Sequence, residues 1–370
     1  MKFSSILNSS SKDISTEIEK GFISVPKGCY IHLEKQAAKY ILENIKSSLS
    51  TGRGLTSRIQ TFTEDSGTPL TLANFLTYYQ LDIRSFYSRE ISFVRRCVQA
   101  SCRPDFSEPD EKLISNALPA LSAINSRRWL TFLLKVLPHI ENYTMEHFSD
   151  AEKRLLNMTL ITLWKKGGQN LSFPSPLDAL RQLKNSPILF EEILDILRYN
   201  LEHIDFIDEA IDLGFASPLD LHCRYSRDQI FTAFDIADPS SIRQGVRYIA
   251  DKKIDVFIVT LNKSEKDYSP TTMYNDYSIN EYLFHWQSQS TTSADSPTGL
   301  RYINHVQQGS KVLLFVRENK KEFEQTAPFT FLGTAQYVTH DGSNPMNITW
   351  RLDKPIPADF LKKSNKLLEG

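Results

Sequence analysis

The residues best suited to recognise a ligand stand together in one stretch, Tyr282–Ser290, which reads Tyr-Leu-Phe-His-Trp-Gln-Ser-Gln-Ser. Its first half has the bulk of a buried strand. Its second half, from Gln287 to Ser290, carries amide and hydroxyl groups that donate and accept hydrogen bonds without carrying charge. A strand that leaves the core in a row of such groups predicts an edge that reads a ligand. Tyr282 to Trp286 is then expected to anchor the strand in the core.

The chain lacks the common catalytic motifs. It has no phosphate-binding loop of the type Gly-x-x-x-x-Gly-Lys-Ser/Thr, no Asp-Glu-Ala-Asp box, no Gly-x-Ser-x-Gly elbow and no His-Glu-x-x-His. An alternative is a hydrolase in which His285, His305 and His340 converge with Asp276 or Asp341, although a histidine in a β fold is more often structural. We predict a protein that is not an enzyme, with no catalytic residue and no cofactor.

Metal binding and a membrane location are not expected either. The four cysteines are scattered, and Cys97 and Cys102 have no second Cys or His pair nearby at zinc-ligand spacing. The Asp205–Asp212 run lacks the spacing of a metal loop and is expected to be a solvated face. Met1–Ser15 has no apolar signal-peptide core, and no apolar window is long enough to span a membrane. With no disulfide framework, these features predict a cytoplasmic protein.

Charge is balanced overall but uneven along the chain. The formal net charge of the 370 residues is -1, so a global basic field is absent. Residues 51–104 hold seven arginines against four acidic residues, a local charge of +3, and Arg84, Arg89, Arg95 and Arg96 lie on or beside one expected helix. This predicts a face that contacts phosphates, with a solvated face of ordinary ion pairs as the alternative. Residues 141–220 hold fourteen acidic residues against seven basic ones, which favours scaffolding or protein docking.

Hydrophobic spacing predicts an α+β protein, helical first and β-rich afterwards. After a lead-in and first helix (1–54) come a trihelical, helix-turn-helix-like unit (55–104), an acidic helical bundle (105–216) and a β-rich domain (217–370). In the trihelical unit, Thr71 is expected to cap the second helix, and the third runs over Ile83–Ala100. The β-rich domain is expected to be a small, strongly bent sheet or pseudobarrel. Its expected strands are Gly245–Ile249, Asp255–Leu261, Tyr282–Ser290, Lys311–Arg317, Phe329–Thr339 and Met346–Leu352.

Residues 219–357 resemble an uncharacterised domain at the C-terminus of bacterial superfamily 2 helicases. The resemblance rests on Leu221–Ser226, Leu261–Lys266, Tyr274–Tyr277, Leu283–Ser290, Arg301–Ile303, Leu314–Glu318, Phe331–Ala335 and Pro345–Ile348. Residues 29–215 are more loosely similar to the helical segment after the motor in those proteins, with Gly67–Leu72 matching its helix-turn-helix-like element. Those helicases often carry a phospholipase-D-like nuclease and look like parts of restriction or phage-defence systems. The motor and the nuclease are not found in this chain, so their activities are not carried over. The strand pattern also looks like PUA/SRA-like or plant B-three-type pseudobarrels.

The resemblance implies a non-catalytic DNA-recognition module of a helicase-type system. Its partners would be DNA (duplex, modified, or with a flipped base) and the helicase or nuclease domains or subunits. Gln287, Ser288, Gln289 and Ser290 would then reach base edges or a flipped base, since Gln pairs with adenine and Ser with several bases. Supporting contacts are expected from phosphate-binding cations and from aromatic or imidazole side chains beside the base: Lys263, Lys266, Arg301, Arg317, Lys320, Lys321, Tyr274, Tyr277, His285 and Trp286. For Trp286 core packing is the alternative, and for Lys320 and Lys321 simple solubility.

A second hypothesis belongs to a different class. In it the chain is a protein-interaction or scaffold module, in which the acidic helices dock a helicase motor or partner subunit and the β domain recognises protein. The placement of the cations discriminates between the two hypotheses. If Lys263, Lys266, Arg301 and Arg317 lie on different faces, DNA binding loses most of its support.

Overall fold

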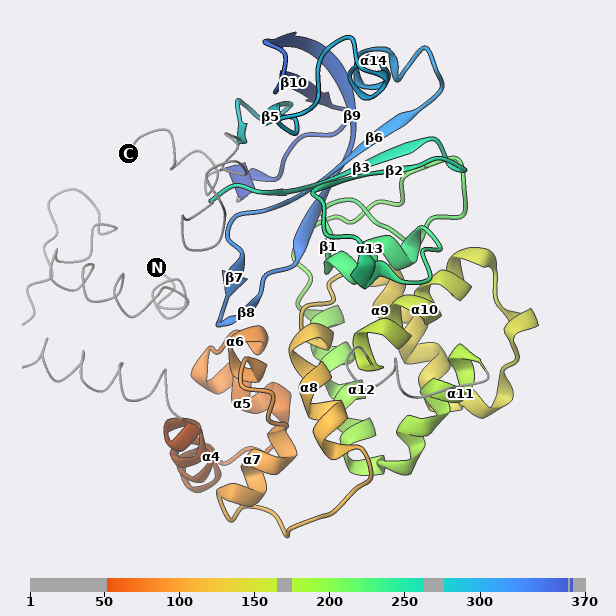
Figure 1. The fold of residues 1–370 in the computed structure, drawn as a ribbon. Helices are drawn as coiled ribbons and strands as arrows, with labels where there is room; N and C mark the ends of the chain where they lie inside the picture. Colours follow the sequence, from red (N-terminus) through yellow and green to blue (C-terminus); the bar gives the residue numbers. More distant parts are fainter. Residues whose placement is uncertain (1–51, 165–174, 263–275, 359, 362–370) are drawn as a thin grey trace, which may run out of the picture. The chain divides into compact units, whose positions relative to one another are not determined.

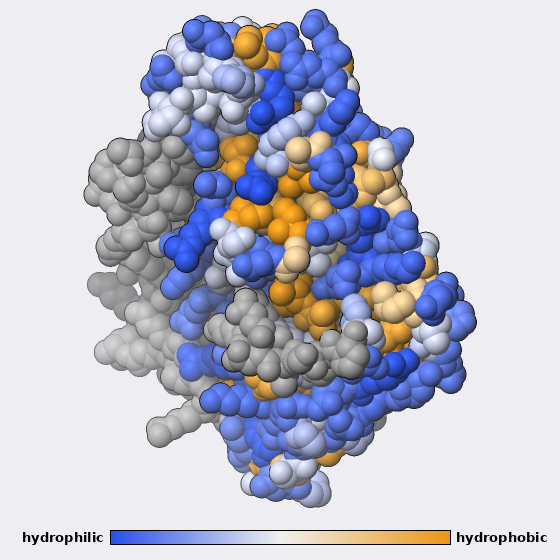
Figure 2. Space-filling view, turned by 45° about the vertical axis from the view of Figure 1, so that its right-hand side comes forward, coloured by the Kyte–Doolittle hydropathy of each residue, from blue (hydrophilic) through white to orange (hydrophobic). Residues whose placement is uncertain are grey.

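The computed structural model describes residues 52–164, 175–262, 276–358 and 360–361 (Figure 1). The helix expected at Glu34–Ser47 and the predicted site residues Lys263, Lys266 and Tyr274 lie outside these ranges. The fold is mixed α+β, with helices first and a mixed sheet afterwards, as expected. Polar side chains cover much of the face in Figure 2, and apolar ones gather in patches between them. Among the described residues, no helix combines the length and apolar character needed to cross a membrane.

The chain divides into two compact units. Unit 1 contains residues 1–122 and 183–199, and unit 2 contains residues 123–182 and 200–370. The expected boundaries at 104/105 and 216/217 therefore do not coincide with these units, and the helices of the expected acidic bundle are shared between them. The reason is that the helix of residues 187–202 packs largely with the N-terminal helices, far from it in sequence.

Unit 1 is helical. Its helices are α4 (Gly52–Asp65), α5 (Leu72–Tyr79), α6 (Ile83–Tyr87), α7 (Phe93–Gln99), α8 (Glu111–Leu121) and most of α12 (Pro187–Glu202). Buried aromatic rings fill the space among the first of these, and Phe75 contacts Phe62, Phe86 and Phe93 at centroid distances of 5.8–5.9 Å. The Thr71 side chain accepts a hydrogen bond from the Asn74 amide, so the predicted helix cap is present.

The third helix predicted from sequence is in fact two helices. Residues 88–92 separate α6 from α7, Glu90 has a φ of 56°, and the Ser92 hydroxyl caps α7 by accepting from the Arg95 amide. Ser92 therefore begins a new helix where apolar spacing alone suggested continuity, because its side chain competes for backbone donors. The expected trihelical unit accordingly holds four helices.

Some helices of unit 2 precede its sheet and others lie between the strands in sequence. They are α9 (Arg127–Val136), the 3-10 turns η1 (Leu137–Asn142) and η2 (Met145–His147), α10 (Asp150–Trp164), α11 (Pro176–Arg181), α13 (Arg227–Ala233), the turn η4 (Pro239–Ser241) and α14 (Pro297–Asn304); η3 (Gln182–Asn185) leads back into unit 1. Helix α10 packs along α13, and the side-chain Nε2 of Gln229 in α13 donates to the Thr162 hydroxyl of α10 at 2.7 Å. The position of α13 thus depends on helices that precede residue 217.

The sheet of unit 2 has the strand order β2-β3-β6-β9-β10-β5-β4, with β1 paired to β9. The strands are β1 (Arg224–Tyr225), β2 (Val246–Ile249), β3 (Ile254–Thr260), β4 (Tyr277–Ser278), β5 (Leu283–Gln287), β6 (Lys311–Arg317), β9 (Phe329–Asp341) and β10 (Asn347–Leu352). β3 and β6 are parallel and the other pairs antiparallel. A separate hairpin joins β7 (Lys321–Glu322) and β8 (Gln325–Thr326).

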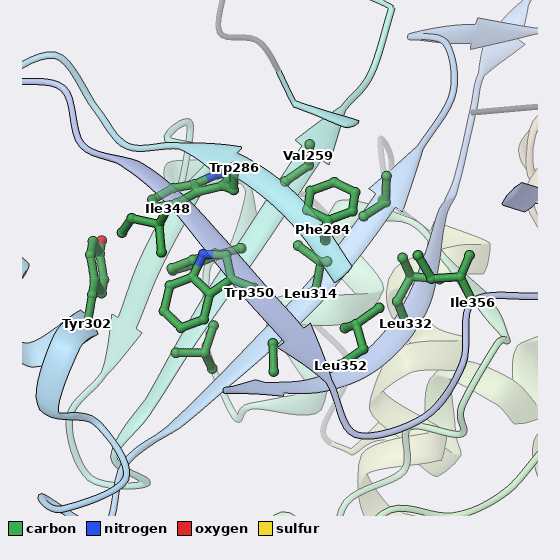
Figure 3. Packing of buried hydrophobic residues seen from close by; sticks show 14 of the residues in the cluster. Val259, Phe284, Trp286, Tyr302, Leu314, Leu332, Ile348, Trp350, Leu352 and Ile356 are labelled. Atoms are coloured by element: carbon green, nitrogen blue, oxygen red, sulfur yellow. The ribbon is translucent and has the colours of Figure 1, made fainter. Parts of the chain in front are cut away.

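The sheet curls strongly around one apolar core. β5 lies several strands from β3 in the sheet, yet the Trp286 indole stacks on the Phe257 ring at 4.2 Å. Figure 3 shows Trp286, Trp350 and Tyr302 within this core. Gly333, at a φ of 97° beside an irregularity of the β6–β9 register, lets β9 bend; a Cβ there would meet Leu221 at 2.9 Å. In the described pairing β2 and β4 remain edges, so the bent sheet is open and the expected pseudobarrel is not closed.

Candidate functional site

A cavity of about 380 Å³, lined by both polar and apolar side chains, lies where the two sides of the bent sheet face each other. One side is contributed by α13, the loop before β2, and the ends of β3 and β6; the other is contributed by the end of β5 and the residue before β4. The lining residues are Arg227, Arg243, Gln244, Gly245, Val246, Ile258, Val259, Thr260, Asp276, Trp286, Gln287, Gln289, Arg317 and Phe329. Gln287, Gln289, Trp286 and Arg317, predicted from sequence, are thus brought together at one cavity.

The end of β5 is fixed by Ser288. The residue is fully buried, its hydroxyl accepts from the Met346 amide at 2.8 Å, and its own amide donates to the Met346 carbonyl at 2.9 Å. Ser288 therefore fastens the chain to the segment before β10, and its side chain does not line the cavity. Ser290, which we expected beside the ligand, is exposed and is not part of the lining either.

Gln287 is held from both sides. Its amide donates to Oδ1 of Asp276 at 3.0 Å, and its Nε2 donates to Oδ1 of Asn347 at 3.0 Å. Asp276 is buried, with 6% of its surface exposed, and lines the cavity beside it. These contacts fix a carboxylate and an amide side by side at the wall.

Gln289 and Arg243 present less constrained side chains. Gln289 is half-buried and Arg243 is exposed. Within the described part of the chain neither side chain has a hydrogen bond or ion pair, while both line the cavity. An amide and a guanidinium on opposite sides of a cavity are therefore positioned to bind a ligand without first breaking a described contact.

The other two arginines of the cavity are held in place. The Arg227 Nη2 donates to the Gln244 carbonyl. Arg317 donates from Nε to the Thr260 hydroxyl at 3.0 Å and from Nη1 to the Ala327 carbonyl at 2.9 Å, with its guanidinium 4.2 Å from the Phe329 ring centre. These contacts orient the two guanidinium groups at the cavity.

The cavity combines positive charge with neutral hydrogen-bonding groups. Its lining residues include three arginines and one aspartate. The apolar surface comes from Val246, Ile258, Val259, Trp286 and Phe329. Arginine suits phosphate and carboxylate oxygens, and glutamine suits the edge of a base. The cavity volume lies in the range of small-ligand sites.

Arg301 is engaged elsewhere. Its guanidinium pairs with Asp255, from Nε to Oδ2 at 2.8 Å and from Nη2 to Oδ1 at 2.9 Å, and lies 4.1 Å from the Tyr248 ring centre. It does not line the cavity. In this structure Arg301 holds the buried Asp255, while Arg317 lines the cavity.

Tyr277, His285, Lys320 and Lys321 are not among the lining residues, and Trp286 lines the cavity from the core. The imidazole of His285 stacks on Tyr277 at 4.6 Å between β5 and β4, on the face opposite Phe284 and Trp286. Trp286 is 4% exposed, so core packing is its main role. Lys320 and Lys321 stand at the β7–β8 hairpin.

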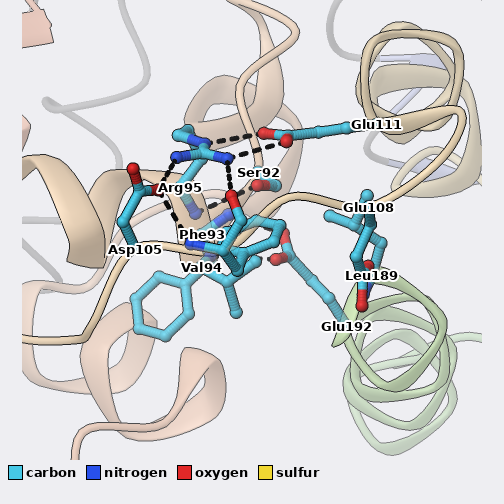
Figure 4. Close-up of polar contacts among 10 residues, drawn as sticks. Ser92, Phe93, Val94, Arg95, Asp105, Glu108, Glu111, Leu189 and Glu192 are labelled. Atoms are coloured by element: carbon cyan, nitrogen blue, oxygen red, sulfur yellow. Dashed lines mark hydrogen bonds and ion pairs between the residues drawn. The ribbon is translucent and has the colours of Figure 1, made fainter. Parts of the chain in front are cut away.

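The four arginines predicted on or beside one helix of unit 1 have different surroundings. Arg95 donates to both oxygens of Glu111, to Asp105 and to the Phe106 carbonyl at 2.6–2.9 Å, and Figure 4 shows its contacts with Glu111 and Asp105. Arg96 is fully buried, with its guanidinium 5.2 Å from the Phe86 ring centre, so it cannot reach a phosphate in this structure. Arg84 lies beside the carboxylate of Asp82, and Arg89 is exposed.

His305 and His340, which were considered for catalysis, are held by contacts within the fold, as His285 is by its stack on Tyr277. His305 is buried; its Nδ1 lies 3.2 Å from the Ser310 carbonyl and its Nε2 accepts from the Tyr337 amide at 3.2 Å. The Nδ1 of His340 contacts the Tyr337 hydroxyl at 2.6 Å. These contacts orient β9 and the end of α14. Neither His305 nor His340 lines the cavity.

One group of possible metal ligands comes together in unit 2. Oxygens of Asp208 and Asp220 and the sulfur of Cys223 lie within 4.8 Å of one another. Each carboxylate is paired with an arginine, Asp208 with Arg127 at 3.2 Å and Asp220 with Arg128 at 2.8 Å. Burial raises the pKa of the Cys223 thiol well above its usual range. The group is thus a charge-balanced buried cluster with a protonated thiol, which suits packing better than a cation.

Sequence reasoning missed Arg227, Arg243 and Gln244. Arg227 is the first residue of α13, directly after the cap residue Ser226. Arg243 and Gln244 lie in the loop before β2. The available signal was their position at the ends of elements, where loops place binding groups. Their position points to the cavity only in the folded structure, where the bent sheet brings these three residues to the same cavity as the end of β5.

Comparison with curated proteins finds no match to the chain. Residues 219–363, which hold the sheet and every residue that lines the cavity, match the family model described as a domain of unknown function (DUF3427).

Proposed function

We propose that the chain is a non-catalytic DNA-recognition module of a helicase-type restriction or phage-defence system, and that it reads DNA at the cavity of unit 2. The observation that carries the proposal is the joining of Gln287 and Gln289 with Arg227, Arg243 and Arg317 at one cavity. Phosphate contacts position a protein on DNA, and contacts with base edges specify sequence. Arginines beside glutamines provide both kinds of contact within a single site.

Two further points support the proposal. The resemblance of residues 219–357 to the C-terminal domain of certain helicases gives DNA as the expected substrate of the whole system. The bent open sheet, with a cavity between its two sides, is also the kind of arrangement that PUA/SRA-like and plant B-three-type pseudobarrels provide, an analogy at the level of the fold.

The test measures DNA binding by the full chain, because α10 supports α13 and a fragment beginning at residue 217 would remove it. Fluorescence anisotropy with duplex, methylated duplex and single-stranded DNA is recorded over a series of salt concentrations. We expect salt-sensitive binding, and Arg243→Gln should lower the salt slope by about 1 for a duplex.

Arg247→Gln is the matched control. Arg247 is exposed on β2, four residues along, and does not line the cavity. This variant should bind DNA as the wild type does. Absence of salt-sensitive binding to all three DNAs, or equal losses in both variants, would refute the proposal.

A second candidate function, a protein-interaction module that docks a helicase motor, is favoured by an exposed apolar patch. Ile279, Tyr282 and Val338 are 42%, 38% and 49% exposed and line one open groove of unit 2 with Leu283 and Arg351. If this candidate is right, Tyr282→Ser weakens a complex with the motor and spares DNA binding. Under the DNA-recognition proposal, Arg243→Gln is the variant with an effect and Tyr282→Ser has none on DNA.

A further inference from the structure

We propose that Cys97 and Cys102 form a redox-modification site, at which a hydroperoxide converts the two thiols into a disulfide that locks the end of α7. Both cysteines are free thiols in the structure. Cys97 is buried in the last turn of α7, and Cys102 is half-buried in the turn that follows. The site belongs to unit 1 and the cavity to unit 2, so the inference goes beyond the proposed function and does not depend on it.

The turn after α7 brings the two cysteines together. The Cys102 amide donates to the Cys97 carbonyl at 2.9 Å, and the Ser101 amide donates to the Val98 carbonyl at 2.9 Å. Ser101 has a φ of 58°, in the left-handed region. Two such bonds around a left-handed residue make the Schellman motif, in which the side chains at the positions of Cys97 and Cys102 frequently contact each other.

The first of these hydrogen bonds also limits the separation of the two Cα atoms. Standard bond lengths place Cα and O of Cys97 about 2.4 Å apart, and N and Cα of Cys102 about 1.5 Å apart. With the N–O distance of 2.9 Å between them, the Cα atoms are at most about 6.8 Å apart. Disulfides join Cα atoms about 4.4–6.8 Å apart, and only separations above about 7 Å require the backbone to move. Rotation of the two side chains is therefore the movement that bonding requires.

The two thiols have different surroundings, and this sets the order in which they react. Cys97 has none of its surface exposed. Burial raises the pKa of its thiol to about 12, and the nearby Cys102 thiol adds to that rise. The half-buried Cys102 has its Sγ 3.4 Å from the Ala100 carbonyl oxygen and 3.5 Å from the Thr63 hydroxyl. A small oxidant therefore reaches Cys102 first, and Cys97 is the resolving thiol.

The reaction has two steps. The Cys102 thiolate attacks one oxygen of hydrogen peroxide, the O–O bond breaks, and Cys102 becomes a sulfenic acid while the other oxygen leaves as water. The Cys97 sulfur then attacks the sulfenic sulfur, the S–O bond breaks, and the oxygen leaves as water with the Cys97 proton. The two thiols together lose two electrons, and one peroxide is reduced to two waters.

The experiment treats the full chain with hydrogen peroxide, denatures it, blocks the remaining thiols with iodoacetamide and analyses tryptic peptides by mass spectrometry. One peptide begins at Cys97, after Arg96, and holds both cysteines. We expect this peptide to lose the mass of two hydrogen atoms and to take up no blocking group until dithiothreitol is added. If both cysteines are blocked after peroxide, or if Cys102 carries a sulfinic acid while Cys97 is blocked, the proposal is wrong.

Three variants test the assigned roles, and thermal unfolding verifies their folds. In Cys97→Ala, Cys102 should accumulate as a sulfenic acid, which dimedone labels. In Cys102→Ser, Cys97 should stay reduced, so oxidation of Cys97 in this variant would contradict the assigned order even if Cys97→Ala does not fold. The matched control is Cys223→Ala, which removes another buried thiol and should leave disulfide formation unchanged.

Hydrogen exchange tests whether the disulfide locks the helix end. The disulfide joins the same two residues as the hydrogen bond from the Cys102 amide, so it opposes the local opening that exposes this amide. We expect the amides of Ser101 and Cys102 to exchange about tenfold more slowly in the oxidised protein than in the reduced one. Peroxide-treated Cys102→Ser should show no slowing at Ser101. Equal exchange in the oxidised and reduced wild type would overturn the lock.

Discussion

The guanidinium of Arg301 donates two parallel hydrogen bonds to the carboxylate of Asp255, from Nε at 2.8 Å and from Nη2 at 2.9 Å. Asp255 lies on β3 with none of its surface exposed, and Arg301 lies on α14. Burial raises the pKa of Asp255, and the hydrogen bonds and charge of Arg301 oppose that rise. The pair therefore fastens α14 to the sheet.

Breaking this pair should strongly destabilise the protein. Arg301→Ala leaves a buried carboxylate without its cation, and we expect the free energy of unfolding to fall by about 3–5 kcal/mol. The double variant Arg301→Met with Asp255→Leu should recover most of that loss, because neither charge remains buried. Urea denaturation measures both. The control Arg247→Ala, on the exposed side of β2, should change stability by less than about 0.5 kcal/mol. A small effect of Arg301→Ala would show that the pair is dispensable.

Two neighbouring arginines of α7 should respond in opposite ways. Arg95 holds Glu111 and Asp105, so Arg95→Met should cost about 2 kcal/mol. Arg96 is fully buried, and its three guanidinium nitrogens have no hydrogen-bond partner within the described residues. Burial, together with the charge of Arg89, lowers its pKa to about 10. Arg96→Met should therefore be neutral or stabilising. Thermal unfolding of the two variants gives the comparison, and a large loss in Arg96→Met contradicts it.

Much of the fold follows from the sequence, because it is encoded locally. Short apolar segments bounded by turn signals predicted β6 at the observed bounds, Lys311–Arg317, and β3 and β10 within one residue at each end. The break after α6 was not predicted, since Ser92 acts as a cap through its side chain while apolar residues continue on both sides. The division into units was not predicted either, because α12 packs with helices about one hundred residues away, where Glu192 bonds the Tyr87 hydroxyl at 2.8 Å.

The candidate site was predictable in part. The amides at the end of β5 stand out in sequence because they interrupt an apolar strand, and Gln287 and Gln289 do line the cavity. Whether each of the other predicted side chains reaches the cavity depends on its burial and on its hydrogen-bond or ion-pair partners. Neither can be predicted from residue type. Ser288 turned inward to hold the Met346 amide, and Arg301 paired with Asp255, while Arg243, which had no distinguishing pattern, reached the cavity.

Ser288 and Ser290 provide a test of how β5 is anchored. Ser288→Ala leaves the buried Met346 amide without the hydroxyl that accepts its hydrogen bond, which should lower the free energy of unfolding by about 1–3 kcal/mol. Ser290→Ala, at an exposed position two residues along, should change it by less than about 0.5 kcal/mol. Chemical denaturation measures both. Equal effects would mean that the hydroxyl of Ser288 does not carry the anchor.

Stability should fall as pH decreases through the range in which His305 becomes protonated. Burial lowers the pKa of His305 below 6.5, against the opposing effect of its contact with the Ser310 carbonyl. In the folded protein its Nε2 accepts from the Tyr337 amide, and protonation removes that acceptor. Below about pH 6.5 the unfolded chain therefore binds more protons than the folded one, so the free energy of unfolding decreases with falling pH, by at most about 1.4 kcal/mol per pH unit for this group.

Burial also lowers the pKa of His222, so this residue contributes with the same sign. The free energy of unfolding is measured by urea denaturation at pH 7.5, 6.5 and 5.5. His305→Gln, which does not titrate, should be less stable at pH 7.5 and should show a shallower decline toward pH 5.5. His222→Gln should remove a separate part of the slope. An unchanged slope in His305→Gln would show that the imidazole is not held neutral between the Ser310 carbonyl and the Tyr337 amide.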